Sequence, residues 1–220
     1  MKKYSWLLWL STILIGCSVE PPQSSPVGQQ STSTSIQKEP SMSSETPMPN
    51  SNISQESLPG SEIFRFRTGE PGWYIVNDTV MGGVSQSEAE ILLAETLYFT
   101  GQMSLDNNGG FASVRSDWQP MNLEGRDRVL LRVQGDGSSY RLRVRTTETG
   151  RDVSYNALFP TEKATWKLIY IPFSIMVPTY RGFVMDVDAL DPATIASFGF
   201  MLTDKQDGEF ELQVDWLRAV

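Results

Sequence analysis

The stretch that decides the fold is residues 73–87, which read WYIVNDTVMGGVSQS. It begins as an aromatic and β-branched run that is typical of a strand. The run ends at Asn77 and Asp78, whose side chain types favour turns because they bond nearby backbone. Gly82 and Gly83 then allow a close backbone approach that a Cβ would prevent. Two interpretations fit this stretch: a tight turn at a sheet edge, or a shaped polar surface for a partner or ligand.

Downstream of this stretch, short segments alternate between apolar and polar residues, which is the pattern of strands with one buried face. The clearest are residues 128–134, 140–145, 153–159, 197–202 and 210–216. In the last of these, Phe210, Leu212, Val214 and Trp216 fall on one face. Residues 166–171 predict a further, mostly apolar strand that Pro172 ends. Helical spacing is confined to residues 88–96 and to one turn over 191–196 with Asp191 as its N-cap. The sequence therefore predicts an all-β domain over residues 61–220, folded as an antiparallel β-sandwich.

Two further features lie between these strands. The segment Gly135-Asp136-Gly137-Ser138-Ser139 predicts a hairpin loop. Arg141, Arg143 and Arg145 follow on one face of the next strand, and Arg132 is expected beside them. Either this row is a solvated outer face paired with Glu and Asp of neighbouring strands, or it is a docking stripe for an acidic partner or an anionic glycan.

The N-terminal residues 1–16 have the pattern of a signal peptide. Two lysines precede an apolar run of about 13 residues, which is too short to cross a hydrocarbon core that needs ~20. The run ends in Leu14-Ile15-Gly16-Cys17, which resembles the lipobox of bacterial lipoproteins and predicts lipidation of Cys17. Residues 17–60 are rich in Ser, Pro and Gln and predict a disordered linker. We therefore expect a chain of the cell envelope, lipid-anchored to a membrane, with its domain on the exported side.

Composition limits the chemistry. The chain has no histidine and one cysteine, which removes Ser-His-Asp and Cys-His nucleophiles and zinc sites built on these residues. A net charge of −8 argues against a nucleic-acid partner. Oxygen ligands for calcium are present, but no spacing singles out a carboxylate pair. We expect no enzyme activity, no catalytic residues, no cofactor and no metal site, and the sequence leaves calcium binding open.

Two glycine-containing motifs carry a family resemblance. They are N-D-x-V-M-G-G-x-S at residues 77–85 and N-N-G-G-F-x-S-x-R at residues 107–115. With Gly135 to Gly137, Trp166 and the Asp204-Lys205-x-x-Gly208 stretch, they resemble the complex I intermediate-associated protein family over residues 63–217. The founding members of that family are mitochondrial assembly factors for NADH:ubiquinone oxidoreductase.

The resemblance implies a jelly roll of the galactose-binding-like kind. It also implies a non-enzymatic, chaperone-like accessory or assembly role, in which a membrane-tethered protein binds subunits of a membrane protein complex. A complex I-type NADH dehydrogenase is one candidate for that complex. The alternative is a carbohydrate-binding module at the cell surface, with a glycan as the partner.

The resemblance further implies that the two motifs lie together in loops at one end of the sandwich, where they would bind a partner or ligand or merely shape the fold. The candidate residues are Asn77, Asp78, Met81, Gly82, Gly83, Ser85, Asn107, Asn108, Gly109, Gly110, Arg115 and Trp118. The aromatic rings of Trp118 and Tyr180 are candidates for stacking on a sugar or anchoring a partner, or for packing within the loops.

Overall fold

Two antiparallel sheets face each other in the computed structural model, which describes residues 59–220. The first sheet has six strands in the order β3-β4-β13-β6-β9, with β1 also paired to β13. Its strands are β1 Ser61–Phe64, β3 Gln86–Leu92, β4 Thr96–Met103, β6 Arg128–Gly135, β9 Lys167–Pro172 and β13 Gly208–Ala219. The predicted signal peptide and linker lie outside the described residues, apart from the linker's last two.

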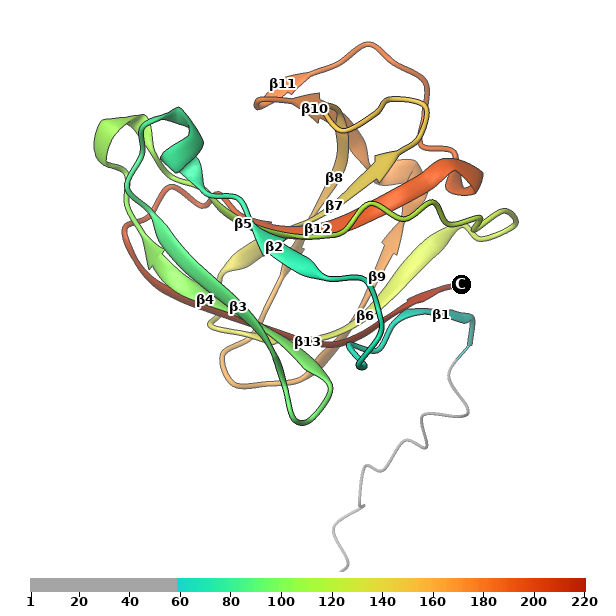
Figure 1. Ribbon diagram of the computed structural model, residues 1–220, viewed down its shortest axis with the longest axis horizontal. Helices are drawn as coiled ribbons and strands as arrows, with labels where there is room; N and C mark the ends of the chain where they lie inside the picture. The colour runs from blue at the N-terminus through green and yellow to red at the C-terminus, as the bar shows by residue number, and fades with distance from the viewer. Residues whose placement is uncertain (1–58) are drawn as a thin grey trace, which may run out of the picture. The chain divides into compact units, whose positions relative to one another are not determined.

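The second sheet has seven strands in the order β11-β10-β8-β7-β12-β5-β2 (Figure 1). Its strands are β2 Trp73–Ile75, β5 Ala112–Ser116, β7 Ser139–Thr146, β8 Ser154–Pro160, β10 Val177–Tyr180, β11 Phe183–Val184 and β12 Ile195–Leu202. Within residues 59–220, the connections hold the 3-10 helices η2 Asp78–Met81, η3 Asp106–Asn108, η4 Phe173–Ile175 and η5 Pro192–Thr194. The predicted all-β sandwich is confirmed.

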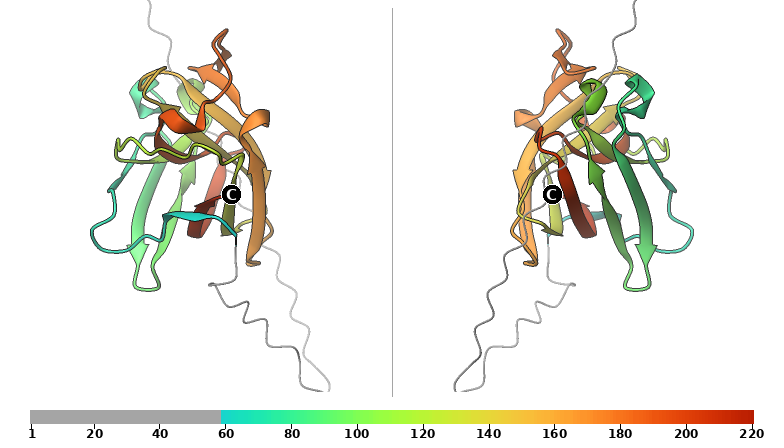
Figure 2. Two further views of the ribbon diagram at one scale, coloured as in Figure 1. Left: turned by 90° about the vertical axis from the view of Figure 1, so that its right-hand side faces the viewer. Right: turned by 90° about the vertical axis from the view of Figure 1, so that its left-hand side faces the viewer.

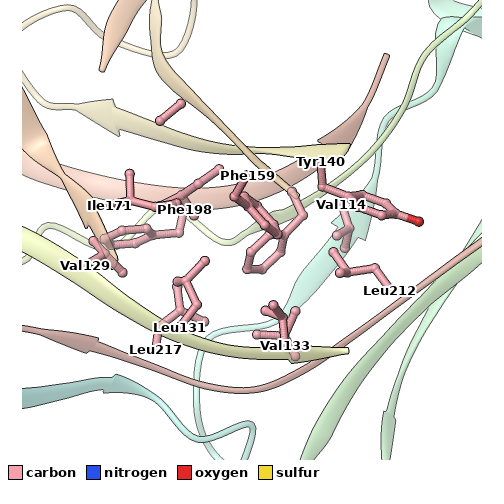
Figure 3. Packing of buried hydrophobic residues seen from close by; sticks show 14 of the residues in the cluster. Val114, Val129, Leu131, Val133, Tyr140, Phe159, Ile171, Phe198, Leu212 and Leu217 are labelled. Atoms are coloured by element: carbon pink, nitrogen blue, oxygen red, sulfur yellow. The ribbon is translucent and has the colours of Figure 1, made fainter. Parts of the chain in front are cut away.

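The core fills the space between the sheets (Figure 3). Val114, Tyr140 and Phe198 reach it from the seven-stranded sheet, and Leu131 and Leu212 reach it from the six-stranded sheet. All five are fully buried. Alternation explains this arrangement, because every second residue of these strands points inward and the residues between them face away from the core.

Three local predictions are wrong, and in each case the cause is how strands distant in the sequence pair or divide between the two sheets. Residues 88–96 form the end of β3, a turn and the first residue of β4 rather than a helix, because pairing with β4 overrides the helix propensity of their Glu, Ala and Leu. The segment 135–139 is not a hairpin loop, since β6 and β7 belong to different sheets. Arg132 consequently lies on the other sheet from Arg141, Arg143 and Arg145.

A fourth prediction, that Trp216 shares a face with Phe210, Leu212 and Val214, is also wrong because β13 contains a bulge. Val214 pairs with Val133, but Trp216 pairs with Arg132 and Leu217 with Leu131. Trp216 therefore leaves the core face that Phe210, Leu212 and Val214 share, and Leu217 takes its place in the core cluster. The predicted turn at 191–196 is confirmed as η5, where the Asp191 side chain accepts a hydrogen bond from the backbone N–H of Ala193 at 2.9 Å.

Candidate functional site

The motif at residues 77–85 connects the two sheets. Strand β2 pairs with β5 in one sheet, and β3 pairs with β4 in the other, so the intervening chain is a crossing rather than a hairpin turn. It forms η2, which ends at Gly82 in the left-handed conformation at φ 94°. The glycine allows the chain to reverse there without the steric cost that a side chain would add.

The buried carboxylate of Asp78 joins this motif to the second one. Its Oδ1 accepts a hydrogen bond from the Ser85 backbone N–H at 3.0 Å, and its Oδ2 accepts one from the Ser85 hydroxyl at 2.5 Å. The same Oδ2 accepts the backbone N–H of Gly110 at 2.7 Å and that of Phe111 at 3.3 Å. Burial by itself would raise the pKa of Asp78, but the hydrogen bonds from Ser85, Gly110 and Phe111 hold it below its ordinary value. The two motifs therefore lie together as expected.

Two glycines leave the room that this carboxylate needs. A Cβ on Gly83 would lie 2.4 Å from the Asp78 Cγ, and one on Gly109 would lie 2.7 Å from its Oδ2. Asn107 and Asn108 adopt consecutive left-handed conformations at φ 56° and 59°, which asparagine tolerates better than most residues. These positions shape the loop backbone.

The first motif divides into a buried polar set and an exposed apolar set. Asn77, Asp78 and Ser85 are buried, and the Asn77 Oδ1 accepts a hydrogen bond from the Ser87 hydroxyl at 2.8 Å. Val80 and Met81 on η2 are 69% and 64% exposed. The polar set thus holds a loop whose apolar side chains face solvent.

A cavity of about 500 Å³ opens beside this loop, over the outer face of the seven-stranded sheet. Its walls come from the motif loops on one side and from the segment after β10 on the other, with β5, β12 and β7 between them (Figure 1). Of the predicted site residues, Met81, Gly109, Gly110 and Arg115 line it. Asn77, Asp78, Gly82, Gly83, Ser85, Asn107, Asn108 and Trp118 are not among its lining residues.

The arginines of β7 form part of the cavity floor. Arg143 and Arg145 are 9% and 4% exposed, so the hypothesis of a solvated outer face is wrong for these two residues. No ion pair within residues 59–220 joins them to a carboxylate. The sequence placed both on one face of a strand, but their burial arises from loops that are distant in the sequence.

The two candidate aromatic side chains each carry a guanidinium over the ring. Arg151 lies 4.7 Å from the ring centre of Trp118, and Arg181 lies 5.3 Å from that of Tyr180. Such contacts are cation–π interactions. Each guanidinium covers one face of its ring.

Neither a metal-binding group nor a membrane span is found in the described part of the chain. No three or more Asp, Glu or Cys side chains within residues 59–220 are grouped to hold a metal ion. No helix in the same residues is long and apolar enough to cross a bilayer.

Comparison with known proteins gives a family match over most of the domain. The family model of complex I intermediate-associated protein 30 matches residues 64–214. The mouse mitochondrial complex I intermediate-associated protein 30 is 28% identical over 183 residues, covering 70% of this chain and 54% of that protein. A probable mitochondrial counterpart from Caenorhabditis elegans is 27% identical over 143 residues, covering 56% of this chain and 42% of that protein. The chain thus spans about half the length of these relatives.

Solved structures of carbohydrate-binding modules share the fold. A family 11 module from Clostridium thermocellum, in complex with a β-1,3-1,4-mixed-linked tetrasaccharide, superposes with a TM-score of 0.57 at 16% identity. The match covers 74% of this chain and 97% of that module. A second family 11 module structure, from the cellulase Lic26A-Cel5E of the same organism, gives a TM-score of 0.55 at 15% identity and covers 74% and 95%. At this identity the likeness shows the β-sandwich jelly-roll fold alone.

Proposed function

Because the chain belongs to the complex I intermediate-associated protein 30 family, we propose that it is a non-enzymatic assembly factor that binds subunits of a membrane protein complex. A complex I-type NADH dehydrogenase is the first candidate for that complex, by analogy with the relatives' name.

One observation carries the proposal. The family motif uses its buried polar residues to hold Val80 and Met81 in an exposed position on a braced loop. Packing within the domain does not account for these two side chains, because each leaves most of its surface in solvent. Exposed apolar side chains on a rigid support suit a protein interface, because little conformational entropy is lost on binding and methionine adapts to the partner's shape.

We also propose that the chain is lipid-anchored through Cys17, with its domain on the exported side of a membrane of the cell envelope. Support comes from the sequence of residues 1–17, which lie outside the described residues. An anchor of several acyl chains would hold the domain at the membrane where its partner subunits lie.

The test is affinity purification of the full-length chain from detergent-solubilised membranes, comparing wild type with a Val80→Ser, Met81→Ser double variant. The wild type should recover defined membrane subunits, and the double variant should lose most of them. Both replaced side chains face solvent, so the variant should keep its circular dichroism spectrum and melting temperature.

Leu93→Ser is the matched control, because Leu93 is fully exposed in the β3–β4 turn. That turn and η2 lie at opposite ends of β3, as Figure 2 shows for the domain. The control should recover the same subunits as wild type. Equal recovery by the folded double variant would mean that the η2 loop is not the partner site.

A carbohydrate-binding module remains the second candidate, since the cavity lies on the outer face of a jelly-roll sheet. The guanidinium groups over Trp118 and Tyr180 weigh against stacking by a neutral sugar. A glycan array probed with and without calcium tests this function. A neutral glycan bound by the wild type, alongside failure to recover membrane subunits, would put it first.

A further inference from the structure

A row of register partners crosses the outer face of the seven-stranded sheet. From β10 to β2 the row consists of Val177, Asn156, Arg143, Gly199, Arg115 and Tyr74. Register partners share a face, so Arg143 and Arg115 flank Gly199, where a Cβ would lie 3.4 Å from the Arg115 Cγ. Arg145 pairs with Ser197 in the next row. The sheet thus presents three arginine side chains on one face.

Part of their hydrogen-bonding capacity is unused. Arg143 is bonded within the chain: its Nε donates to the Ser154 hydroxyl at 3.1 Å, its Nη2 donates to the same hydroxyl, and its Nη1 donates to the Met201 sulfur at 3.3 Å. The Arg145 Nε donates to the Arg151 carbonyl at 3.1 Å. The Arg145 Nη1 and the Arg115 Nε are buried without a hydrogen-bond partner in the described part of the chain. Arg145 itself is 4% exposed and lines the cavity.

The charges of these arginines are costly in the free domain. Burial and the charges of Arg145, Arg115 and Arg141 lower the pKa of Arg143 to about 9. Burial and the nearby charge of Arg115 lower the pKa of Arg145 to about 10. Arg115, Arg143 and Arg145 still carry a positive charge at neutral pH. They form a buried cluster of cations in a protein whose net charge is negative. An anion from outside the domain would compensate the cluster.

An apolar hollow continues the cavity along the same face. A second hollow of about 560 Å³ shares Arg143, Gly182, Met201 and Thr203 with the first. Its other lining residues include the exposed apolar side chains Leu158, Ile175, Val177 and Val184. We call the two hollows together the concave groove. Six strands contribute to the register row, so it is roughly 24 Å long, the length of about seven extended residues.

We propose that the concave groove binds an extended peptide segment, with a carboxylate of the segment on Arg115, Arg143 and Arg145 and its apolar side chains on the Leu158 and Val177 side. The inference rests on the proposed function, because the segment would belong to a subunit of the membrane complex. Arginine suits this role, since its planar guanidinium pairs with a carboxylate through two parallel hydrogen bonds. The exposed apolar side chains of the second hollow, and the guanidinium over the ring of Tyr180 in the first, favour a peptide over a saccharide.

The test selects phage-displayed random heptapeptides on the purified full-length chain and then measures single peptides by fluorescence polarisation. Selected peptides should carry Asp or Glu next to apolar residues. Replacing the acidic residue of a peptide by its amide, or making the Arg145→Gln protein, should weaken binding by about tenfold or more. Arg115→Gln should act in the same direction, which guards against a folding defect in one variant.

Arg132→Gln is the matched control, because it removes one arginine charge from the other sheet. It should leave the affinity within about twofold, while Leu158→Ser should weaken it several-fold through the apolar hollow. Selected peptides without acidic residues, or with equal affinity for wild type and the folded Arg145→Gln protein, would overturn the inference.

Inorganic phosphate and an oligogalacturonate serve as competing probes. If either binds at Arg145 while no acidic peptide is selected, the groove is a small-anion or acidic-saccharide site and the peptide inference is wrong. Peptide selection needs no partner complex, so its failure is distinct from failure of the assembly role. Val80 and Met81 also line the first hollow, so the variants that test the groove itself are Arg145→Gln and Leu158→Ser, which lie outside the η2 loop.

Discussion

At the scale of single residues, Asp78 is the group on which the two motifs depend. Asp78→Asn should lower the free energy of unfolding by about 3 kcal/mol or more at pH 7, because an amide nitrogen would face N–H donors where a carboxylate accepted them. Urea unfolding followed by circular dichroism measures this loss. Asp106→Asn is the matched control, since Asp106 is an exposed carboxylate in the neighbouring η3, and it should change stability little.

The lowered pKa of Asp78 also determines how the stability of the domain changes with pH. Its folded pKa lies below the unfolded value of about 3.9, so its stabilisation is fully present above the unfolded value. The stabilisation is lost as the pH falls through the folded pKa. Wild type should therefore lose stability more steeply than Asp78→Asn between roughly pH 4 and pH 2. Parallel pH profiles for the two proteins would contradict the role of the charged form.

Replacing Arg115 should stabilise the domain, whereas replacing Asp78 should destabilise it. Burial lowers the pKa of Arg115, which Tyr74 beside it offsets in part, and its Nε has no hydrogen-bond partner in the described part of the chain. Arg115→Met keeps a long side chain and removes the charge, so it should stabilise the free domain by about 1 kcal/mol. Thermal unfolding should shift upward by about 2–4 °C.

Arg132→Met gives the comparison for this prediction. Arg132 pairs with Asp215 and lies over the ring of Trp166, so its loss should be neutral or destabilising. A lower melting temperature for Arg115→Met would mean that the chain itself compensates this charge. A higher one would mean that the arginine is kept at a cost to stability, as groups at functional sites often are.

At the scale of elements, one hydroxyl links the two sheets. Tyr140 lies on β7, and its hydroxyl donates to the Glu211 carbonyl on β13 at 3.0 Å. Its ring is fully buried, and burial with the nearby Asp136 carboxylate raises its pKa far above the usual range. Tyr140→Phe should cost about 1 kcal/mol, a fall in melting temperature of about 2–4 °C. Tyr98→Phe on the six-stranded sheet is the control, and its partly exposed hydroxyl should matter less.

The sequence predicts strands better than it predicts which sheet holds them. Alternation identified most of the long strands, because each buries one side and alternation records burial directly. It could not show that residues 77–85 and 135–139 cross between sheets, since a crossing and a hairpin use the same Gly and Asp residues. The bulge beside Trp216 was equally hidden, because one extra residue leaves the local pattern intact.

The candidate site was predictable in part for the same reason. The motifs identified the loop residues around Asp78, whose hydrogen bonds run between positions that both motifs contain. The cavity was not predictable, because its floor joins residues of β5, β7 and β12 whose placement is set by strand order. A row of arginines on one face of a strand was the one available signal.

At the scale of the whole molecule, the folded domain and the proposed anchor are separate parts of the sequence. Every residue of the core cluster lies between Phe64 and Leu217, while Cys17 lies outside the described residues. Cys17→Ala should therefore leave the melting temperature unchanged. If lipid on Cys17 holds the chain at a membrane, the variant should move from the membrane fraction to the soluble fraction on cell fractionation. Cys17 is the only thiol in the chain, so loss of a disulfide cannot explain such a shift.

The Cys17→Ala variant should also affect the recovery of partner subunits. A flexible linker of the predicted length has an end-to-end distance of roughly 35 Å, so an anchored domain meets membrane subunits at a raised local concentration. Cys17→Ala should then recover fewer membrane subunits from cells, while the purified variant binds selected peptides as tightly as wild type. Retention of the variant in membranes that only detergent releases would show that something other than Cys17 holds the chain there. Loss of peptide binding by the variant would instead tie the concave groove to the N-terminal residues, which no contact of the described domain suggests.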